Sequence, residues 1–211
     1  MINVENICLT LKNRDILTSV SITMEPGNIY GLVGNNGSGK TMLMKVICGL
    51  VKPTSGTVTC DGIIIGKDRD YLPDAGIIIE TPGFISYYSG FKNLKFLAGI
   101  RGKIGNEEIR KAMEDVGLDP KLRLPVRKYS LGMRQRLGIA QAIMENPRYL
   151  VFDEPMNGLD KNGIAQARKL LLDRKAAGVT IILSSHNRDD IDILCDHVYE
   201  MEQGYMTEVK A

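Results

Sequence analysis

The fold of this chain is decided by the stretch Gly34-Asn35-Asn36-Gly37-Ser38-Gly39-Lys40-Thr41. It fits the pattern G-x-x-x-x-G-K-[ST], in which glycines let the backbone curl so that successive N–H groups face phosphate oxygens. The apolar run 29–33 before it is typical of a buried parallel strand, and the run 42–48 after it is compatible with a helix. Strand, loop and helix form the context that this pattern requires, so we predict a phosphate-binding P-loop rather than an ordinary glycine-rich turn.

The loop also predicts how a nucleotide is held. The positive end of the following helix dipole acts on the same anion as the loop amides. Lys40 supplies a mobile positive charge for the β- and γ-phosphates, and the Thr41 hydroxyl is a candidate Mg²⁺ ligand. The predicted nucleotide-binding residues of this segment are Gly34, Asn35, Asn36, Gly37, Ser38, Gly39, Lys40, Thr41 and Met42.

Length and composition limit the class of protein. A chain of 211 residues with 44% hydrophobic and 25% charged residues accommodates one α/β unit with a small subdomain. Its net charge of +2 is too small to predict a nucleic-acid surface. No apolar run approaches the roughly 18–20 residues of a membrane span, and the N-terminus lacks a signal-peptide pattern, so we expect a soluble, cytoplasmic chain. Its four cysteines are scattered, which favours reduced thiols, and its two histidines form no zinc pattern.

The order of apolar runs predicts an α/β core interrupted by helices. We expect strands within 2–23, with a turn at Asn13-Arg14-Asp15, and at 63–65, 77–79, 149–152 and 179–183. We expect helices at 107–116 capped by Asn106, at 130–146 capped by Ser130, around 164–178 and at 189–195, and a hairpin turn at Gln203-Gly204. The chain then forms one domain, with residues 1–81 and 146–211 in the core and 82–145 in a mostly helical subdomain.

Two further segments have chemical interest. Asp153 and Glu154 follow the apolar run 149–152, at the carboxyl end of a predicted strand, where such sheets bind ligands. Asp153 would reach the Mg²⁺ region and Glu154 could polarise an attacking water, although two solvated carboxylates at a strand end would look the same. Ser130 and Gly132, within Tyr129-Ser130-Leu131-Gly132-Met133-Arg134-Gln135-Arg136, would form a second anion site at a helix N-terminus, although an ordinary N-cap is the simpler interpretation of that segment alone.

Together these segments resemble the ATP-binding cassette (ABC) family. Residues 34–41 resemble its Walker A motif, 130–135 its LSGGQ signature, and 150–155 its Walker B motif with the catalytic glutamate. Asn157-Gly158-Leu159-Asp160 resembles its D-loop, and His186 stands at the place of its switch histidine. The order and spacing match from residue 2 almost to the end of the sequence. The implied fold is a P-loop NTPase (RecA-like) core with a mostly parallel sheet, an N-terminal antiparallel β subdomain and an inserted α-helical subdomain.

The resemblance implies an ATP hydrolase that works as a head-to-tail pair. Each ATP would lie between the P-loop of one chain and Ser130 and Gly132 of the other, with Mg²⁺ as cofactor. Glu154 would act as general base, His186 would contact the γ-phosphate, and Asp160 would couple the two sites. The second histidine, His197, has no such place and is expected to be structural.

The sequence departs from the family at two positions. Glu80 stands where the family has a glutamine that meets Mg²⁺ and the attacking water; as a metal ligand it would add negative charge there. Glu80 and the segment 126–133 resemble the subgroup of cassettes for peptide-antibiotic export and self-immunity, of the bacitracin-resistance and lantibiotic kind. Leu11 stands where the family often has an aromatic residue on which adenine stacks. Because leucine has no aromatic ring, we expect weak stacking and relaxed base selectivity.

The resemblance therefore implies the ATPase subunit of a transporter, peripheral on the inner face of the cell membrane through a separate permease. The coupling helices of that permease would dock beside Glu80, near Tyr87, Tyr88 and Phe91, although these aromatics could equally form a subdomain core. The rival functions are a soluble ABC ATPase of DNA repair or translation, a nucleotide-binding regulator that does not hydrolyse, and a P-loop kinase. The first would have coiled-coil insertions or a second cassette, and the last would have no use for the segment 130–135.

Overall fold

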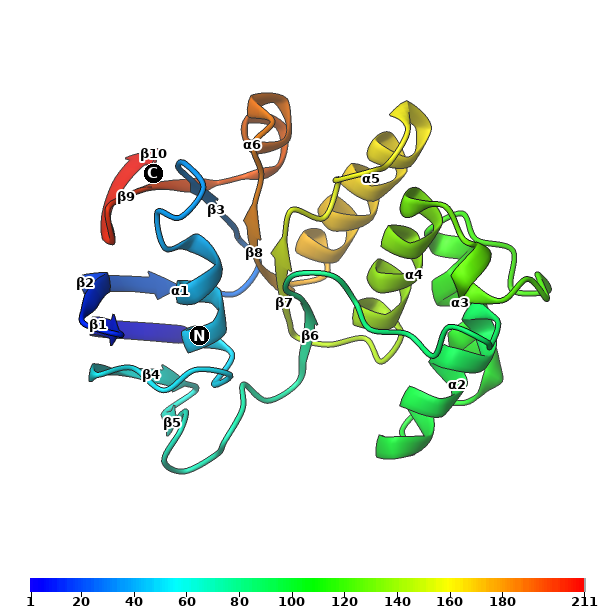
Figure 1. Ribbon diagram of the computed structural model, residues 1–211, viewed down its shortest axis with the longest axis horizontal. Helices are drawn as coiled ribbons and strands as arrows, with labels where there is room; N and C mark the ends of the chain where they lie inside the picture. The colour runs from blue at the N-terminus through cyan, green and yellow to red at the C-terminus, as the bar shows by residue number, and fades with distance from the viewer. Residues whose placement is uncertain (211) are drawn as a thin grey trace.

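The computed structural model describes residues 1–210, which fold into two sheets and a lobe of helices (Figure 1). The first sheet is antiparallel and has the strand order β2-β1-β4-β5. The second has the order β10-β9-β3-β8-β7-β6 and is parallel from β9 to β6. The strands are β1 (Ile2–Leu11), β2 (Arg14–Met24), β3 (Ile29–Val33), β4 (Ser55–Cys60), β5 (Ile63–Ile64), β6 (Ala75–Ile78), β7 (Tyr149–Asp153), β8 (Thr180–Ser184), β9 (His197–Glu202) and β10 (Tyr205–Lys210).

The central strands β3, β7 and β8 of the larger sheet are buried on both faces, which explains why they read as continuous apolar runs. On β7, Tyr149 and Val151 pack with the antiparallel sheet and α1, whereas Leu150 and Phe152 pack with the other helices. The helix that follows the P-loop, α1, thus lies between the two sheets (Figure 1). The helices are α1 (Lys40–Ile47), α2 (Gly90–Arg101), α3 (Asn106–Asp115), α4 (Leu131–Ile143), α5 (Lys161–Ala176) and α6 (Arg188–Leu194), with a 3₁₀ turn at Val126–Lys128.

Helices α2, α3 and α4 form a lobe at one end of the molecule, opposite the antiparallel sheet (Figure 1). A hydrogen bond ties its parts together, since the Gly90 amide donates to the buried Tyr129 hydroxyl at 3.2 Å. A Cβ at position 90 would lie 2.8 Å from that hydroxyl oxygen, so the start of α2 requires glycine. The expected α/β class, with a mostly parallel sheet, an N-terminal antiparallel sheet and helices, is confirmed.

Some expected boundaries were wrong. Helix α3 begins at Asn106 and its N-cap is Gly105, whose amide is taken by the Glu108 carboxylate at 2.9 Å, so Asn106 is the first helical residue and not the cap. The first hairpin turns at Lys12-Asn13 rather than at 13–15. Both residues of that turn have positive φ, 48° and 61°, as a type I′ turn demands.

Two strands differ from the expected ranges 63–65 and 77–79, since each ends one residue earlier and the second also begins two residues earlier. Strand β5 ends at Ile64, and β6 runs from Ala75 to Ile78 and stops before Ile79. Glu80, directly after Ile79, adopts a left-handed backbone conformation with φ 61°, which departs from the extended geometry of the strand. The N-cap at Ser130 and the turn at Gln203-Gly204 are confirmed.

Across residues 1–210, no helix has both the length and the apolar character that crossing a bilayer requires. All four cysteines are free, and three of them are buried.

Candidate active site

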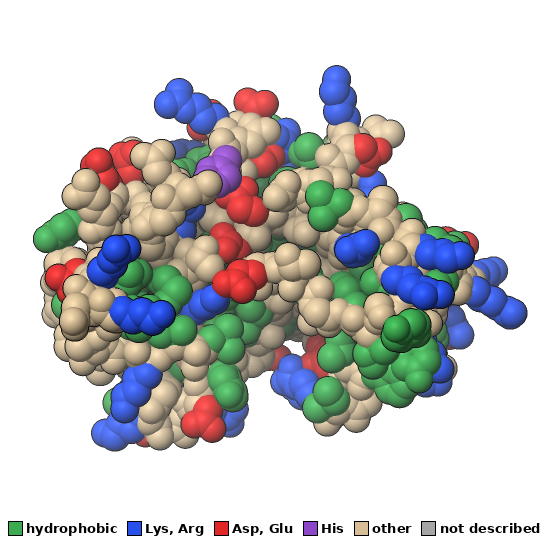
Figure 2. Space-filling view, in the orientation of Figure 1, with side chains coloured by type: hydrophobic (Ala, Val, Ile, Leu, Met, Phe, Trp, Pro, Cys, Tyr) green, Lys and Arg blue, Asp and Glu red, His purple; other side chains and the backbone are tan. Residues whose placement is uncertain are grey.

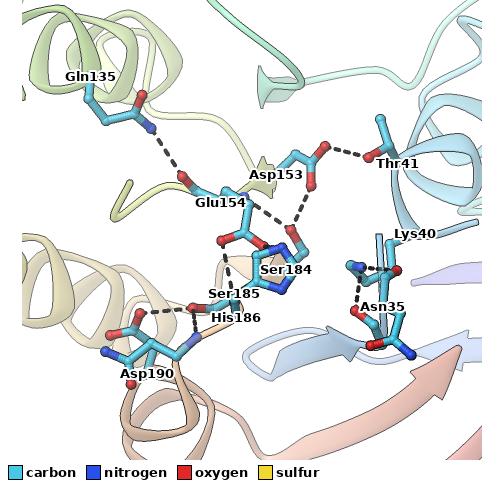
Figure 3. A network of polar contacts seen from close by, with 12 residues as sticks. Asn35, Lys40, Thr41, Gln135, Asp153, Glu154, Ser184, Ser185, His186 and Asp190 are labelled. Atoms are coloured by element: carbon cyan, nitrogen blue, oxygen red, sulfur yellow. Dashed lines mark hydrogen bonds and ion pairs between the residues drawn. The ribbon is translucent and has the colours of Figure 1, made fainter. Parts of the chain in front are cut away.

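The P-loop connects β3 to α1 and encloses its own lysine. Lys40 Nζ donates to the carbonyl oxygens of Gly34 at 2.7 Å and Asn35 at 3.0 Å (Figure 3). The hydroxyl of Ser38 is buried and has no partner within residues 1–210. A buried ammonium and an unsatisfied hydroxyl inside a ring of backbone amides are the donor set that a phosphate chain satisfies. The loop therefore fits a nucleotide.

The turn of the last hairpin supports the loop from behind. The Gly204 amide donates to the Ser38 carbonyl at 3.1 Å, and the Thr18 amide on β2 donates to the Gly204 carbonyl at 2.9 Å. Gly34, with φ 137°, lies against β9, because a Cβ there would lie 2.2 Å from the Met201 carbonyl oxygen. The phosphate-binding backbone is thus fixed by contacts with β2, β9 and the turn between β9 and β10.

A chain of hydroxyls holds the first carboxylate at the end of β7. Thr41 Oγ1 donates to Asp153 Oδ2 at 2.6 Å, and Ser184 Oγ donates to Asp153 Oδ1 at 2.6 Å (Figure 3). Ser184 Oγ also accepts from the Glu154 amide at 3.0 Å. Ser184 is fully buried at the end of β8 and was not expected from the sequence.

The donors at this point fit Mg²⁺. A hydroxyl and a carboxylate are the hard oxygen ligands that Mg²⁺ takes from P-loops, with the rest of its shell from phosphate and water. Among residues 1–210 there is no group of three or more His, Cys, Asp or Glu side chains that could cage a metal by itself. Thr41 and Asp153 would therefore hold a cation that nucleotide phosphates also ligate.

Glu154 and His186 face each other beyond the ends of β7 and β8. The His186 amide donates to Glu154 Oε2 at 3.3 Å, and the imidazole Nε2 lies 3.2 Å from Oε1. Burial raises the pKa of the Glu154 carboxyl, and nearby His186 opposes that rise. A carboxylate with raised basicity beside the phosphate-binding loop is suited to accept a proton from water.

The loop that carries His186 is anchored by a buried carboxylate. Asp190, which is 1% exposed, accepts from Arg168 Nε at 2.8 Å and Nη2 at 2.6 Å, and from Ser185 Oγ at 2.9 Å. The Asn187 amide in turn donates to Ser185 Oγ at 3.1 Å (Figure 3). Sequence reasoning missed this anchor, because an Arg and an Asp 22 positions apart on two different helices carry no local pattern.

The cavity beside the P-loop joins most of the predicted residues. It has a volume of about 410 Å³ and is lined by Ile16, Asn36, Gly37, Gly39, Lys40, Thr41, Met42, Asp153, Glu154 and His186. Figure 2 shows a histidine and several acidic side chains along the middle of this face, between the sheets and the helical lobe. Ile16 lines the cavity and Leu11 does not, so the aliphatic side chain next to the loop is one that the sequence analysis had not selected.

Ser130, Gly132 and Asp160 do not line this cavity. Ser130 caps α4, with its Oγ accepting from the Met133 amide at 3.1 Å. Asp160 caps α5 by accepting from the Gly163 amide at 3.0 Å, and pairs with Arg136 of α4 at 3.1 Å; the amide and then the guanidinium lower its pKa. Within one chain these residues lie apart from the P-loop.

The segment 130–135 nevertheless contacts the loop after β7. A Cβ at Gly132 would lie 2.7 Å from the Gly158 carbonyl oxygen. The Gln135 side chain donates to the Pro155 carbonyl at 3.0 Å and lies 3.4 Å from the Glu154 carbonyl oxygen (Figure 3). The position of the N-terminus of α4 is therefore coupled to the backbone of the general-base candidate.

Glu80 extends from the end of β6, next to β7, and forms an ion pair with Lys45 of α1 at 2.5 Å. Lys45 was not selected from the sequence. The signal that could have found it is its place on α1, one helical turn after Thr41 and on the same face.

The fold and this cavity define a P-loop nucleotide hydrolase, and comparison with known proteins narrows the class. The family model for the ABC transporter domain matches residues 17–157. The uncharacterized ABC transporter ATP-binding protein YybJ of Bacillus subtilis is 43% identical over 97% of this chain and 94% of its own length. The bacitracin transport ATP-binding protein BcrA of Enterococcus faecalis is 40% identical over 99% of this chain and 68% of its own length.

The lantibiotic transport ATP-binding protein SrtF of Streptococcus pyogenes is 36% identical over 97% of this chain and 88% of its own length. Among solved structures, the dimeric ATP-binding cassette MJ0796 with ADP and Pi superposes with a TM-score of 0.87 at 20% identity, covering all of both chains. The chain belongs to the ABC transporter family, as an ATP-binding, ATP-hydrolysing subunit.

Proposed function

We propose that this chain powers the export of a peptide antibiotic or a similar amphipathic compound through a separate permease. The observation that carries the proposal is the Glu154–His186 pair beside a complete P-loop, since a regulator that only binds nucleotide needs no general base. The relatives BcrA and SrtF, named for bacitracin and lantibiotic transport, support the substrate class. Glu80, in place of the glutamine that the family has near Mg²⁺, supports the same subgroup of peptide-antibiotic exporters.

The residues of the cavity divide the work of hydrolysis. Loop amides 34–41 and Lys40 bind the phosphates, and Met42 lies at the same edge of the cavity. Thr41 and Asp153 would hold Mg²⁺, which would neutralise phosphate charge. Glu154 takes the proton of the attacking water and His186 contacts the γ-phosphate.

A second copy completes the site. Ser130 and Gly132 lie outside the cavity of their own chain, and Ser130 sits at the positive end of the α4 dipole. We assign these two residues to the nucleotide of a partner cassette in a head-to-tail pair. Asp160 pairs with Arg136 of α4 and lies at the end of the loop that follows β7. It would then couple the two nucleotide sites of the pair.

The chain would work on the inner face of the cell membrane. Its permease would dock beside Glu80, where Tyr87 is exposed at the start of the helical lobe. The helical subdomain, residues 82–145, would then move when ATP binds or is hydrolysed, and this motion would be passed to the permease.

The head-to-tail pair is tested by running the Glu154→Gln variant on a sizing column with light-scattering detection. We expect a monomer without nucleotide and a dimer with ATP and Mg²⁺ that ADP does not produce. The matched control is Glu107→Gln on the exposed surface of α3, which should dimerise only weakly because it hydrolyses ATP. A Glu154→Gln chain that binds ATP and stays monomeric would show that the pair does not form from this subunit alone.

The transport function is tested in the host cell. Replacing the native gene by its Glu154→Gln form should lower resistance to bacitracin or to a lantibiotic, while the Glu107→Gln form keeps it. If cells with the Glu154→Gln form keep their resistance to both compounds while the purified wild-type protein hydrolyses ATP normally, the substrate class is refuted and the ATPase activity stands.

A further inference from the structure

Helix α1 makes two parallel contacts with the carboxyl edge of the large sheet. Thr41 donates to Asp153 at the end of β7, and one helical turn later Lys45 pairs with Glu80 beyond the end of β6. Because β6 and β7 are neighbours, both contacts lie along one edge. The second contact has no role in the function proposed above.

Glu80 and Glu154 occupy equivalent places on adjacent strands. Ile78 is in register with Phe152, and each glutamate follows its strand residue by two positions. Both have left-handed backbones, with φ 61° for Glu80 and 53° for Glu154. The chain therefore presents two glutamates and Asp153 at the carboxyl ends of two adjacent strands. Asp153 and Glu154 line the cavity beside the P-loop, and Glu80, which does not line it, lies on the neighbouring strand end.

This concentration of negative charge needs compensation. The cations among the residues that meet this edge are Lys40, which is enclosed by the P-loop carbonyls, and Lys45. Lys45 Nζ lies 2.5 Å from Glu80 Oε1, and its side chain is 23% exposed against 66% for Glu80. The lysine is thus the more buried partner, and it holds the more exposed carboxylate against α1.

We propose that Lys45 is a positioning residue that neutralises Glu80 and sets how strongly this carboxylate attracts the Mg²⁺ of bound nucleotide. The proposal rests on the assignment of Thr41, Asp153 and Glu80 to the metal edge. While Glu80 is paired with Lys45, its charge is compensated and the cation is held mainly by Thr41, Asp153 and phosphate. Without the lysine, the carboxylate is free to draw the cation toward β6.

The test is a double-mutant cycle in the Glu154→Gln chain, which retains bound ATP. Mg²⁺ is titrated calorimetrically into the protein–ATP complex of four forms: the parent, Lys45→Met, Glu80→Gln and both together. We expect Lys45→Met to lower the half-saturating Mg²⁺ concentration roughly two- to fivefold where Glu80 is present, the size of an exposed charge pair, and by clearly less in the Glu80→Gln background. Lys45→Arg should restore the parent value.

Two outcomes overturn the proposal. One is an equal shift in both backgrounds, which would mean that Lys45 acts on the nucleotide without Glu80. The other is no shift with either Lys45→Met or Lys45→Gln, the second variant covering poor folding of the first. Failure of the parent to bind ATP would instead refute the assigned site, and ATP titrations on the same samples separate these cases.

Discussion

The His186 amide donates to Glu154 Oε2 while the imidazole Nε2 lies 3.2 Å from Oε1, so one residue contacts both oxygens of the carboxylate. The contact joins the ends of two adjacent strands, β7 and β8. It orients the group that would accept a proton from water, and it places the imidazole at the mouth of the same cavity.

Glu154→Gln should therefore abolish turnover and preserve ATP binding. Loss of a general base lowers a rate by about 10²- to 10⁴-fold, and glutamine keeps the acceptor for the His186 amide. Single-turnover phosphate release and fluorescent-nucleotide binding measure the two effects. Equal hydrolysis by both forms would assign the base elsewhere.

The raised pKa of Glu154 predicts a pH-dependent stability. Burial favours the protonated carboxyl in the folded state, so the contribution of Glu154 to stability is full below its ordinary pKa of 4.5 and is lost as pH rises through the folded value. Wild type should match Glu154→Gln in Tm below pH 4.5 and fall below it at higher pH. Parallel thermal melts across this range check the sign; a Tm difference that is constant with pH would contradict it.

Gly132→Ala should block the ATP-dependent pair while leaving the fold intact. The added Cβ would lie 2.7 Å from the Gly158 carbonyl oxygen, so the N-terminus of α4 and the loop 156–160 must separate. Light scattering in the Glu154→Gln background measures the loss. Gly99→Ala on α2 is the matched control, because a Cβ there meets open space. Replacing a glycine inside a helix by alanine should raise the free energy of unfolding by about 1 kcal/mol.

Asp190→Asn should destabilise the loop that carries His186. Removing the charge leaves the Arg168 guanidinium, whose Nε and Nη2 both donate to Oδ1 of Asp190, without its counter-ion, and breaking a buried pair costs about 3 kcal/mol. Urea unfolding measures the change. Asp189→Asn, an exposed neighbour on the same turn, should stay within about 0.5 kcal/mol of wild type, and an equal loss in the two variants would refute the anchor.

Ile16→Tyr should tighten ATP binding, because Ile16 lines the cavity beside the P-loop and Leu11 does not. Stacking of the base on an aromatic ring would add about 1 kcal/mol or more, or roughly fivefold in Kd. The wild type, which has an aliphatic side chain at this place, should bind ATP and GTP with similar Kd values. Equal ATP affinity of Ile16→Tyr and wild type would show that the base does not lie against Ile16, and a strong preference of the wild type for ATP would contradict the relaxed base selectivity.

The fold could be predicted because its signals are local. The P-loop, the acidic end of β7 and the capping Ser130 each lie within one short segment, so their order along the chain indicated both the sheet and the helical lobe. The boundary errors have equally local causes that the pattern hides: Glu80 takes a left-handed conformation, and Glu108 supplies the cap of α3 from inside the helix.

The support of the site could not be predicted in the same way. Lys45, Arg168, Ser184 and Asp190 act across elements that are far apart in sequence, and each looks like an ordinary helix or strand residue where it stands. Lys45 and Ser184 meet their partners through the register of β6, β7 and β8, and Arg168 and Asp190 meet through the contact of α5 with α6. Only the folded chain supplies these contacts.

The strand order of the large sheet also has a consequence for biosynthesis. β3, which carries the P-loop, is flanked by β8 and β9, and the loop itself rests on Gly204. On the ribosome, residues 29–41 emerge before either neighbouring strand, because β8 ends at Ser184 and β9 at Glu202, and the supporting Gly204 follows β9. Both edges of β3 therefore stay unpaired through most of synthesis, and unpaired strand edges are open to pairing with other chains, which makes this strand an aggregation hazard before the sheet is complete.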